Sequence, residues 1–178
     1  MKPFSQITLD LITGLPQVNG KDAILTIVDH RCSRVAIFIP CTTTITGPGI
    51  VQLYLQNVYP WFGLPSRVIS NRDPRFTLQF GKALTAKLGI NRNISMVFHP
   101  QTDGLSERKN QWVEQYLRMV TSANPEDWTQ WLALASAVHN NRRNMTTGLS
   151  PNQILLGYKP QLLPALRTPG GYRSPRLM

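Results

Sequence analysis

The sequence predicts a single α/β domain built on a five-stranded mixed sheet flanked by helices. Its 178 residues are enough for one hydrophobic core and leave little room for a second. Near the start, three short runs of apolar and β-branched residues follow one another with turn-forming residues between them, which indicates antiparallel strands. The later strand-like runs alternate with segments of helical periodicity. That order is typical of a mixed sheet with helices packed against it.

Five segments have the composition expected of strands. The first three are Gln6–Ile12, Ala23–Val28 and Arg34–Pro40, and turn-forming Gly, Pro, Asn and Ser residues separate them. The remaining two are Arg67–Ser70 and Asn93–Phe98. Each follows a helical segment and is therefore expected to return to the same sheet.

Apolar residues recur at helical spacing in the other segments. We expect helices at Ile50–Trp61, Thr77–Leu88, Leu105–Ala123 and Pro125–Asn141, and a short last helix that ends at Leu156. Residues 1–160 are expected to form the folded core. Residues 161–178 are basic and rich in Pro and Gly, which predicts an irregular tail.

The charge is strongly positive and unevenly spread. Nineteen Lys and Arg against nine Asp and Glu give a formal net charge of +10. Between His30 and Thr102 the only acidic residue is Asp73, and none follows Asp127. A domain this basic most often binds a polyanion, and nucleic acid is the commonest one. The alternative is a basic surface that is merely solvated.

Composition excludes several other classes. With 42% hydrophobic and 16% charged residues and no long apolar run, the chain is neither disordered nor expected to span a membrane. The first residues carry no secretion signal. Cys32 and Cys41 are too few for a disulfide scaffold and lack the spacing of a zinc site. We expect an intracellular protein in a reducing compartment.

Acidic residues on an early strand, at the end of a later strand and on a following helix can converge at one sheet edge and hold two metal ions. Asp10 lies within an apolar strand, where a carboxylate is costly unless it faces a cation or water. Alternatively, its side chain points outward. Glu107 shares a helix face with Asn110 and Glu114, and the alternative there is a solvated polar stripe.

Short sequence blocks in a fixed order carry a resemblance to a known family. The blocks are Leu9–Pro16, Ile27–Asp29, Phe38–Pro40, Gly63–Pro65, Ile69–Thr77, His99–Gly104, Glu107-Arg108 and Gly148–Pro151. In this order they resemble the integrase catalytic core of gypsy-type LTR retrotransposons, over residues 3–160. The resemblance implies a ribonuclease-H-like fold. It also implies DNA 3′-end processing and strand transfer by two-metal phosphoryl transfer.

The resemblance further implies two aspartates and one glutamate that hold Mg²⁺ or Mn²⁺. Asp10 and Glu107 match the first and third positions, but Asn71 stands where the second aspartate is expected. Thirty-five residues separate Asn71 from Glu107, as the family's spacing requires, so the change is a substitution in place. An amide brings oxygen without charge, so we expect weaker metal binding and impaired catalysis. Asp73 is no obvious substitute, because two residues along a strand span about 7 Å.

The same resemblance indicates residues that contact DNA. These candidates are His99, Gln101, Thr102, Arg108, Lys109 and Asn110. Turn chemistry alone also favours the residue types in the loop, and surface solvation explains those on the helix nearly as well. Asp29 is interpreted as a turn residue rather than a fourth metal ligand.

The implied partners are the element's DNA ends, the target DNA and a second copy of the chain, in the nucleus. Trp128 and Trp131 lie on one helix stripe, and one of them is expected at or beside the dimer interface. The zinc-binding and C-terminal DNA-binding regions typical of full-length integrases are not found, so we expect a core alone. The alternative is a degenerate or host-adopted core that acts as a non-catalytic DNA-binding or scaffolding domain. The sequence is equally compatible with a natural and an engineered Asn71.

Overall fold

The structure is a computed structural model that describes residues 2–70, 74–89, 94–98, 104–145 and 147–162. Most of the predicted tail, residues 163–178, lies outside this part of the chain. No helix among the described residues is long and apolar enough to cross a membrane.

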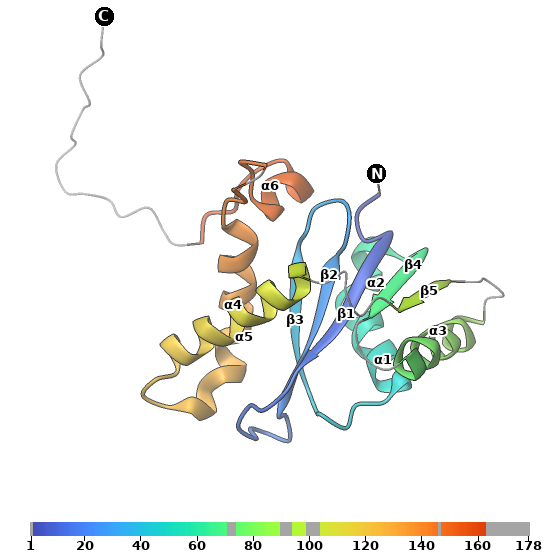
Figure 1. The fold of residues 1–178 in the computed structure, drawn as a ribbon, viewed down its shortest axis with the longest axis horizontal. Coiled ribbons are helices and arrows are strands. Elements are labelled where there is room, and N and C mark those ends of the chain that lie inside the picture. The colour runs from blue at the N-terminus through green and yellow to red at the C-terminus, as the bar shows by residue number, and fades with distance from the viewer. Residues whose placement is uncertain (1, 71–73, 90–93, 99–103, 146, 163–178) are drawn as a thin grey trace, which may run out of the picture.

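The predicted five-stranded mixed sheet is confirmed (Figure 1). Its strands are β1 (Gln6–Ile12), β2 (Ala23–Asp29), β3 (Ala36–Cys41), β4 (Arg67–Ser70) and β5 (Ser95–Phe98), in the order β3-β2-β1-β4-β5. The first three strands are antiparallel neighbours, whereas β4 runs parallel to β1 and β5 runs parallel to β4. The order places β1 at the centre of the sheet, next to the end of β4.

The helices follow the predicted sequence of elements. They are α1 (Gly47–Asn57), α2 (Tyr59–Phe62), α3 (Pro74–Leu88), α4 (Gly104–Val120), α5 (Trp128–Asn141) and α6 (Pro151–Leu156), with a 3₁₀ turn at Pro125–Asp127. The helix expected at Ile50–Trp61 is divided at Val58, whose φ is −123°. Pro60 has no N–H to donate to the preceding turn, so one continuous helix would lose a hydrogen bond there.

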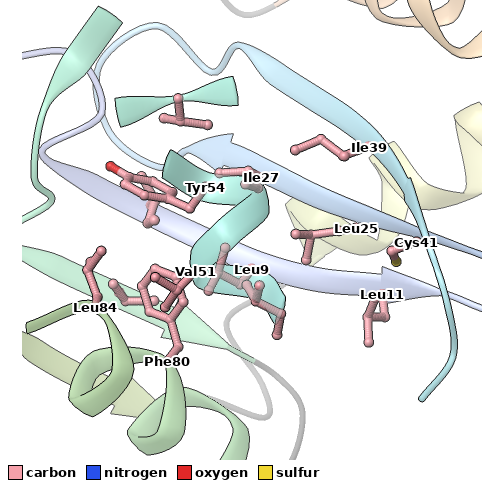
Figure 2. Packing of buried hydrophobic residues seen from close by; sticks show 14 of the residues in the cluster. Leu9, Leu11, Leu25, Ile27, Ile39, Cys41, Val51, Tyr54, Phe80 and Leu84 are labelled. Carbon is pink, nitrogen blue, oxygen red and sulfur yellow. The ribbon is translucent and has the colours of Figure 1, made fainter. Parts of the chain in front are cut away.

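One face of the sheet is covered by α1 and α3. Figure 2 shows side chains from β1, β2 and β3, including Leu9 and Leu25, directed toward Val51 on α1 and Phe80 on α3. Tyr54 packs edge-on against Phe80 at 5.7 Å between ring centroids, and its hydroxyl donates to the Gly63 carbonyl. This face is closed by apolar packing.

The opposite face is covered by α4 and α5 (Figure 1). Val113 and Leu117 on α4, with Trp128 and Leu132 on α5, pack against the apolar residues that β1, β2 and β3 present there. Because side chains alternate along a strand, Asp10 lies on the face opposite to Leu9 and Leu11. The strand pattern therefore places this carboxylate under α4.

The outer edge of β3 is closed by a side chain. Asn140 Oδ1 accepts a hydrogen bond from the Ala36 N–H at 2.9 Å, and Asn140 Nδ2 donates to the Ala36 carbonyl at 2.8 Å. Both residues are buried. The amide thus replaces a missing neighbouring strand and satisfies both backbone groups of Ala36, which would otherwise be unpaired at a sheet edge.

Candidate active site

Asp10 lies near the end of the central strand and is half-buried. It pairs with Thr26 of β2, and the neighbouring residue Leu9 pairs with Ser70, the last residue of β4. The end of β4 therefore comes beside Asp10, as expected for two parallel strands that end at one edge. Asn71, the next residue, lies outside the described residues, and so does Asp73.

The carboxylate of Asp10 accepts hydrogen bonds from Asn110 and Leu11 in the described part of the chain. Asn110 Nδ2 on α4 donates to Oδ2 at 2.6 Å, and the Leu11 N–H donates to Oδ1 at 2.9 Å. Charge-assisted hydrogen bonds of this kind are short and orient a carboxylate. The alternative interpretation of Asp10, a side chain that points outward from a strand end, is therefore wrong.

Two buried oxygens without a hydrogen-bond partner among the described residues accompany this carboxylate. One is Oδ1 of Asn110, the same amide that donates to Asp10. The other is Oγ1 of Thr26, the residue of β2 that pairs with Asp10 of β1. Buried polar atoms are nearly always hydrogen-bonded, so two orphaned oxygens beside a carboxylate suit a site where a cation or a donor group completes their coordination.

The helix α4 brings the position of Glu107 toward the same place. Glu107 precedes Asn110 by three residues in α4, so the two positions share one face of the helix. The side chains of Glu107 and Arg108 lie outside the described part of the chain, and the loop candidates His99, Gln101 and Thr102 do so entirely. Within the described ranges, no group of three or more His, Cys, Asp or Glu could hold a metal ion.

Lys109 reaches the turn between β2 and β3. Its Nζ donates to the Arg34 carbonyl at 3.1 Å. Lys109 is half-buried, so surface solvation accounts for only part of its surroundings. Neighbouring residues of α4 thus contact two different parts of the sheet.

Asp29 is the last residue of β2 rather than a turn residue, and its side chain holds the turn that follows. It is 1% exposed, and its Oδ2 accepts from both the backbone N–H and the hydroxyl of Ser33 at 2.8 Å. Its Oδ1 accepts from the Cys32 N–H at 3.2 Å. Both carboxylate oxygens are therefore engaged in holding the turn.

His139 is a buried titratable residue whose environment the sequence did not reveal. Its ring lies edge-on to Phe38 and 4.8 Å from the ring centroid of Trp112. Burial, together with the charges of Lys109 and Arg142, lowers the pKa of His139 from 6.5 to about 3. The imidazole is neutral in the folded protein at physiological pH. The imidazole thus lies against the aromatic rings of Phe38 and Trp112.

The two tryptophans of α5 differ in their surroundings. Trp128 is 1% exposed, and its indole N–H donates to the Pro16 carbonyl at 2.9 Å. Trp131 is only partly buried against the same apolar cluster. Trp128 is therefore a core residue. Trp131 keeps part of its surface exposed, where a partner subunit can contact it.

Comparison with known proteins relates the chain to retrotransposons. It is 36% identical to the Transposon Tf2-3 polyprotein of Schizosaccharomyces pombe over 163 residues, which are 92% of this chain and 12% of the polyprotein. The chain thus spans a small part of this curated relative. No family model matches the sequence.

Solved structures give the fold. The HTLV-2 integrase catalytic core domain, in complex with magnesium in a trimeric form, has a TM-score of 0.64 and 18% identity, with 86% of this chain and 97% of that chain covered. A chain of the simian T-cell lymphotropic virus intasome, in complex with PP2A regulatory subunit B56 gamma, has a TM-score of 0.66 and 18% identity. The match covers 97% of this chain and 61% of that chain.

The sheet order, the flanking helices and these structural neighbours define a ribonuclease-H-like fold, as found in integrase catalytic cores. The curated relative adds the sequence relationship that fold similarity alone does not supply. The chain has the fold of integrase catalytic cores and is similar in sequence to part of a retrotransposon polyprotein.

Proposed function

We propose that this chain is the catalytic core of a retrotransposon integrase, which processes DNA 3′ ends and joins them to target DNA. The observation that carries the proposal is the Asp10 carboxylate held by Asn110, next to the end of β4 and under the α4 face that carries Glu107. A carboxylate oriented in this way suits phosphoryl transfer, in which catalysis depends on positioned charge.

The described donor atoms suit a hard cation. Asp10 supplies a carboxylate, and Asn110 and Thr26 supply buried oxygens without partners among the residues described. Oxygen ligands of these types are preferred by Mg²⁺ and Mn²⁺, whereas zinc sites use Cys and His. We propose that Asp10, Asn71 and Glu107 hold the metal, which would stabilise the charge that develops on the phosphoryl oxygens. The HTLV-2 core was solved in complex with magnesium, which supports this choice.

Asn71 is proposed to impair this site. An amide in place of a carboxylate removes one negative charge from a cluster that must offset the repulsion between two cations. A loss of about 4 kcal/mol of transition-state stabilisation slows a reaction about a thousandfold. The chain would then keep its fold and its affinity for DNA while turning over slowly.

The proposed partners are DNA and a second copy of the chain, and the proposed location is the nucleus. His99, Gln101, Thr102 and Arg108 are proposed to contact the DNA near the cleaved bond, together with Lys109 and Asn110. The net charge of +10 supports a polyanionic partner. The structural neighbour in an intasome supports action on DNA as part of an assembly.

The test compares this chain with Asn71→Asp in nicking and strand-transfer assays with Mg²⁺ and with Mn²⁺. The restored carboxylate should raise the rate by up to about a thousandfold. The matched control is Asn71→Asp combined with Asp10→Asn, which should return the rate to background. Equal rates for this chain and Asn71→Asp would contradict the assignment of Asn71 to the metal site.

The second candidate function is a non-catalytic DNA-binding or scaffolding domain derived from an integrase core. Asn71 itself is the observation that favours it, because a chain selected only for binding has no need of the second carboxylate. The same assay separates the two functions. An Asn71→Asp chain that binds DNA but neither nicks nor joins it would favour the scaffolding role.

A further inference from the structure

A cavity of about 380 Å³ lies between the β2–β3 turn, the start of α4 and the segment that leads into α6. Figure 1 shows these three parts at the same end of the molecule. Arg31 and Arg34 of the turn and Lys109 of α4 line it. Three cationic residues from two distant parts of the chain therefore converge on one hollow.

The charge of this hollow is not neutralised by its own walls. None of the residues that line it is acidic. The nearby Asp29 has both carboxylate oxygens bound by the turn, through Cys32 and Ser33. Among the described residues, neither Arg31 nor Arg34 forms an ion pair. A concave surface with uncompensated positive charge attracts anions.

The turn that carries the arginines is held in place from two sides. Asp29 holds it from within, and Lys109 Nζ binds the Arg34 carbonyl from α4 at 3.1 Å. Arg34 has a φ of +65°, a left-handed conformation that is uncommon for a residue other than glycine. The cationic groups are therefore attached to a backbone whose position is set before any ligand arrives, which reduces the entropy lost on binding.

The hollow and the candidate active site adjoin the same turn of α4. Lys109 contacts the Arg34 carbonyl, whereas the next residue, Asn110, contacts Asp10. Because Lys109 and Asn110 are consecutive residues, the hollow and Asp10 lie on either side of one helical turn, within reach of a single extended polyanion. The positive charge of the hollow complements the negative charge of such a ligand.

The start of α6 and the segment that leads into it line the hollow with three apolar residues, Leu149, Pro151 and Ile154, beside the polar Asn144 and Thr147. Apolar side chains do not stabilise a bare anion, whereas the sugar of a nucleotide packs against them. We propose that this hollow binds a backbone phosphate and the adjoining deoxyribose of the DNA strand held at Asp10. The inference rests on the proposed function, because it takes its ligand to be the DNA on which the active site acts.

The first test measures binding of a fluorescently labelled DNA duplex by the intact chain at about 50 to 200 mM salt. Arg31→Gln combined with Arg34→Gln should weaken binding about tenfold at the lowest salt and reduce the salt slope by about one, as expected for one lost phosphate contact. The matched control is Lys82→Gln combined with Lys87→Gln, which removes two exposed charges from α3. The control should change the affinity by less than about twofold.

The second test needs no substitution of an arginine. Cys32 lines the hollow and is half-buried, whereas Cys41 is 1% exposed. A duplex whose backbone phosphate carries a short tether with an activated aryl disulfide should form a mixed disulfide with Cys32. The Cys32 thiolate attacks the disulfide and the aryl thiol leaves. Unmodified duplex should compete, and Cys32→Ser should abolish the product.

The outcomes separate this inference from the proposed function. If the unsubstituted chain does not bind duplex at low salt, the proposed function fails as well. If it binds with a steep salt dependence, but the double arginine variant binds equally well and Cys32 is not cross-linked, only the DNA site in this hollow is overturned. Saturable binding of inorganic phosphate at constant ionic strength without cross-linking would indicate a free-anion site and would overturn it too. Should the double variant unfold, cross-linking of the unsubstituted chain decides.

Discussion

Asn110 Nδ2 donates a 2.6 Å hydrogen bond to Oδ2 of Asp10, joining α4 to the central strand across 100 residues of sequence. The amide has one oxygen and one nitrogen, and here only the nitrogen has a partner among the described residues. The contact therefore orients the carboxylate while it leaves the amide oxygen available. We expect Asn110 to act as a positioning residue for Asp10.

Replacing Asn110 by alanine should slow strand transfer by about tenfold to a hundredfold in an Asn71→Asp background. A hydrogen bond to a charged group contributes about 1.5 to 3 kcal/mol, and each 1.36 kcal/mol is a tenfold change in rate. Single-turnover rates over a range of Mg²⁺ concentrations measure the effect. Glu114→Gln, one helical turn further along α4, serves as the control. If Asn110→Ala leaves the single-turnover rates unchanged, Asn110 does not position Asp10 for catalysis.

Asn71→Asp should tighten the binding of Mn²⁺ or Mg²⁺ by about tenfold or more, because a carboxylate adds a negative charge to the ligand set. Calorimetric titration of both proteins measures this without any turnover. Asp10→Asn in the same background should abolish the gain. Equal affinities for the two chains would show that Asn71 is not at the metal site.

His139 should make the protein less stable in mild acid. Its pKa is about 3 in the folded protein, so between pH 3 and 6.5 the unfolded chain binds the extra proton. The contribution of His139 to the free energy of unfolding is therefore nearly constant well above pH 6.5 and falls as the pH drops below it, by about 2 kcal/mol at pH 5. Urea unfolding at pH 5 and 7 measures the change.

The matched variant for this measurement is His139→Phe, which keeps an aromatic ring between Phe38 and Trp112 but cannot titrate. Its unfolding free energy should differ less between pH 5 and 7 than that of the unsubstituted chain. An identical pH dependence in both proteins would mean that other groups cause the acid sensitivity.

Asn140→Ala should destabilise the fold by about 2 to 4 kcal/mol, because it removes two buried hydrogen bonds and leaves the N–H and carbonyl of Ala36 unpaired. Asn140→Asp should be no milder, since its second oxygen cannot donate to the Ala36 carbonyl. Thermal and urea unfolding give the loss. Gln130→Ala, on the exposed part of the same helix, is the control and should change stability little. If Asn140→Ala is as stable as the unsubstituted chain, the Asn140 amide does not stabilise the edge of β3.

The chain should form a dimer that involves Trp131. Sedimentation of the intact chain and of Trp131→Glu tests this, and a folded variant that alone loses the dimer supports it. Trp128 is not a suitable probe, because it is buried and hydrogen-bonded to Pro16, so its truncation would cost about 3 to 5 kcal/mol of stability. Folded monomers in both cases would exclude an interface at this helix.

Most of the element order could be predicted from the sequence. The segment Gln6–Ile12 forms a strand with the predicted bounds, and so does Arg67–Ser70. Local patterns suffice here, because apolar alternation and turn residues act over a few neighbouring positions. The division of the helix after Asn57 was missed, since its apolar spacing continues through Val58 although Pro60 interrupts the hydrogen bonds.

What the sequence by itself determined is the class of fold, the basic character of the chain and the presence of Asn71 at a position where the resemblance predicts an aspartate. These properties reside in local periodicity, composition and ordered blocks of residues. Only the tertiary structure decided that Asn110 contacts Asp10, and that Arg31, Arg34 and Lys109 line one hollow. Such contacts join residues about 75 to 100 positions apart, and they depend on how α4 packs across the sheet. No local pattern encodes that packing, because it results from the shapes of many side chains at once.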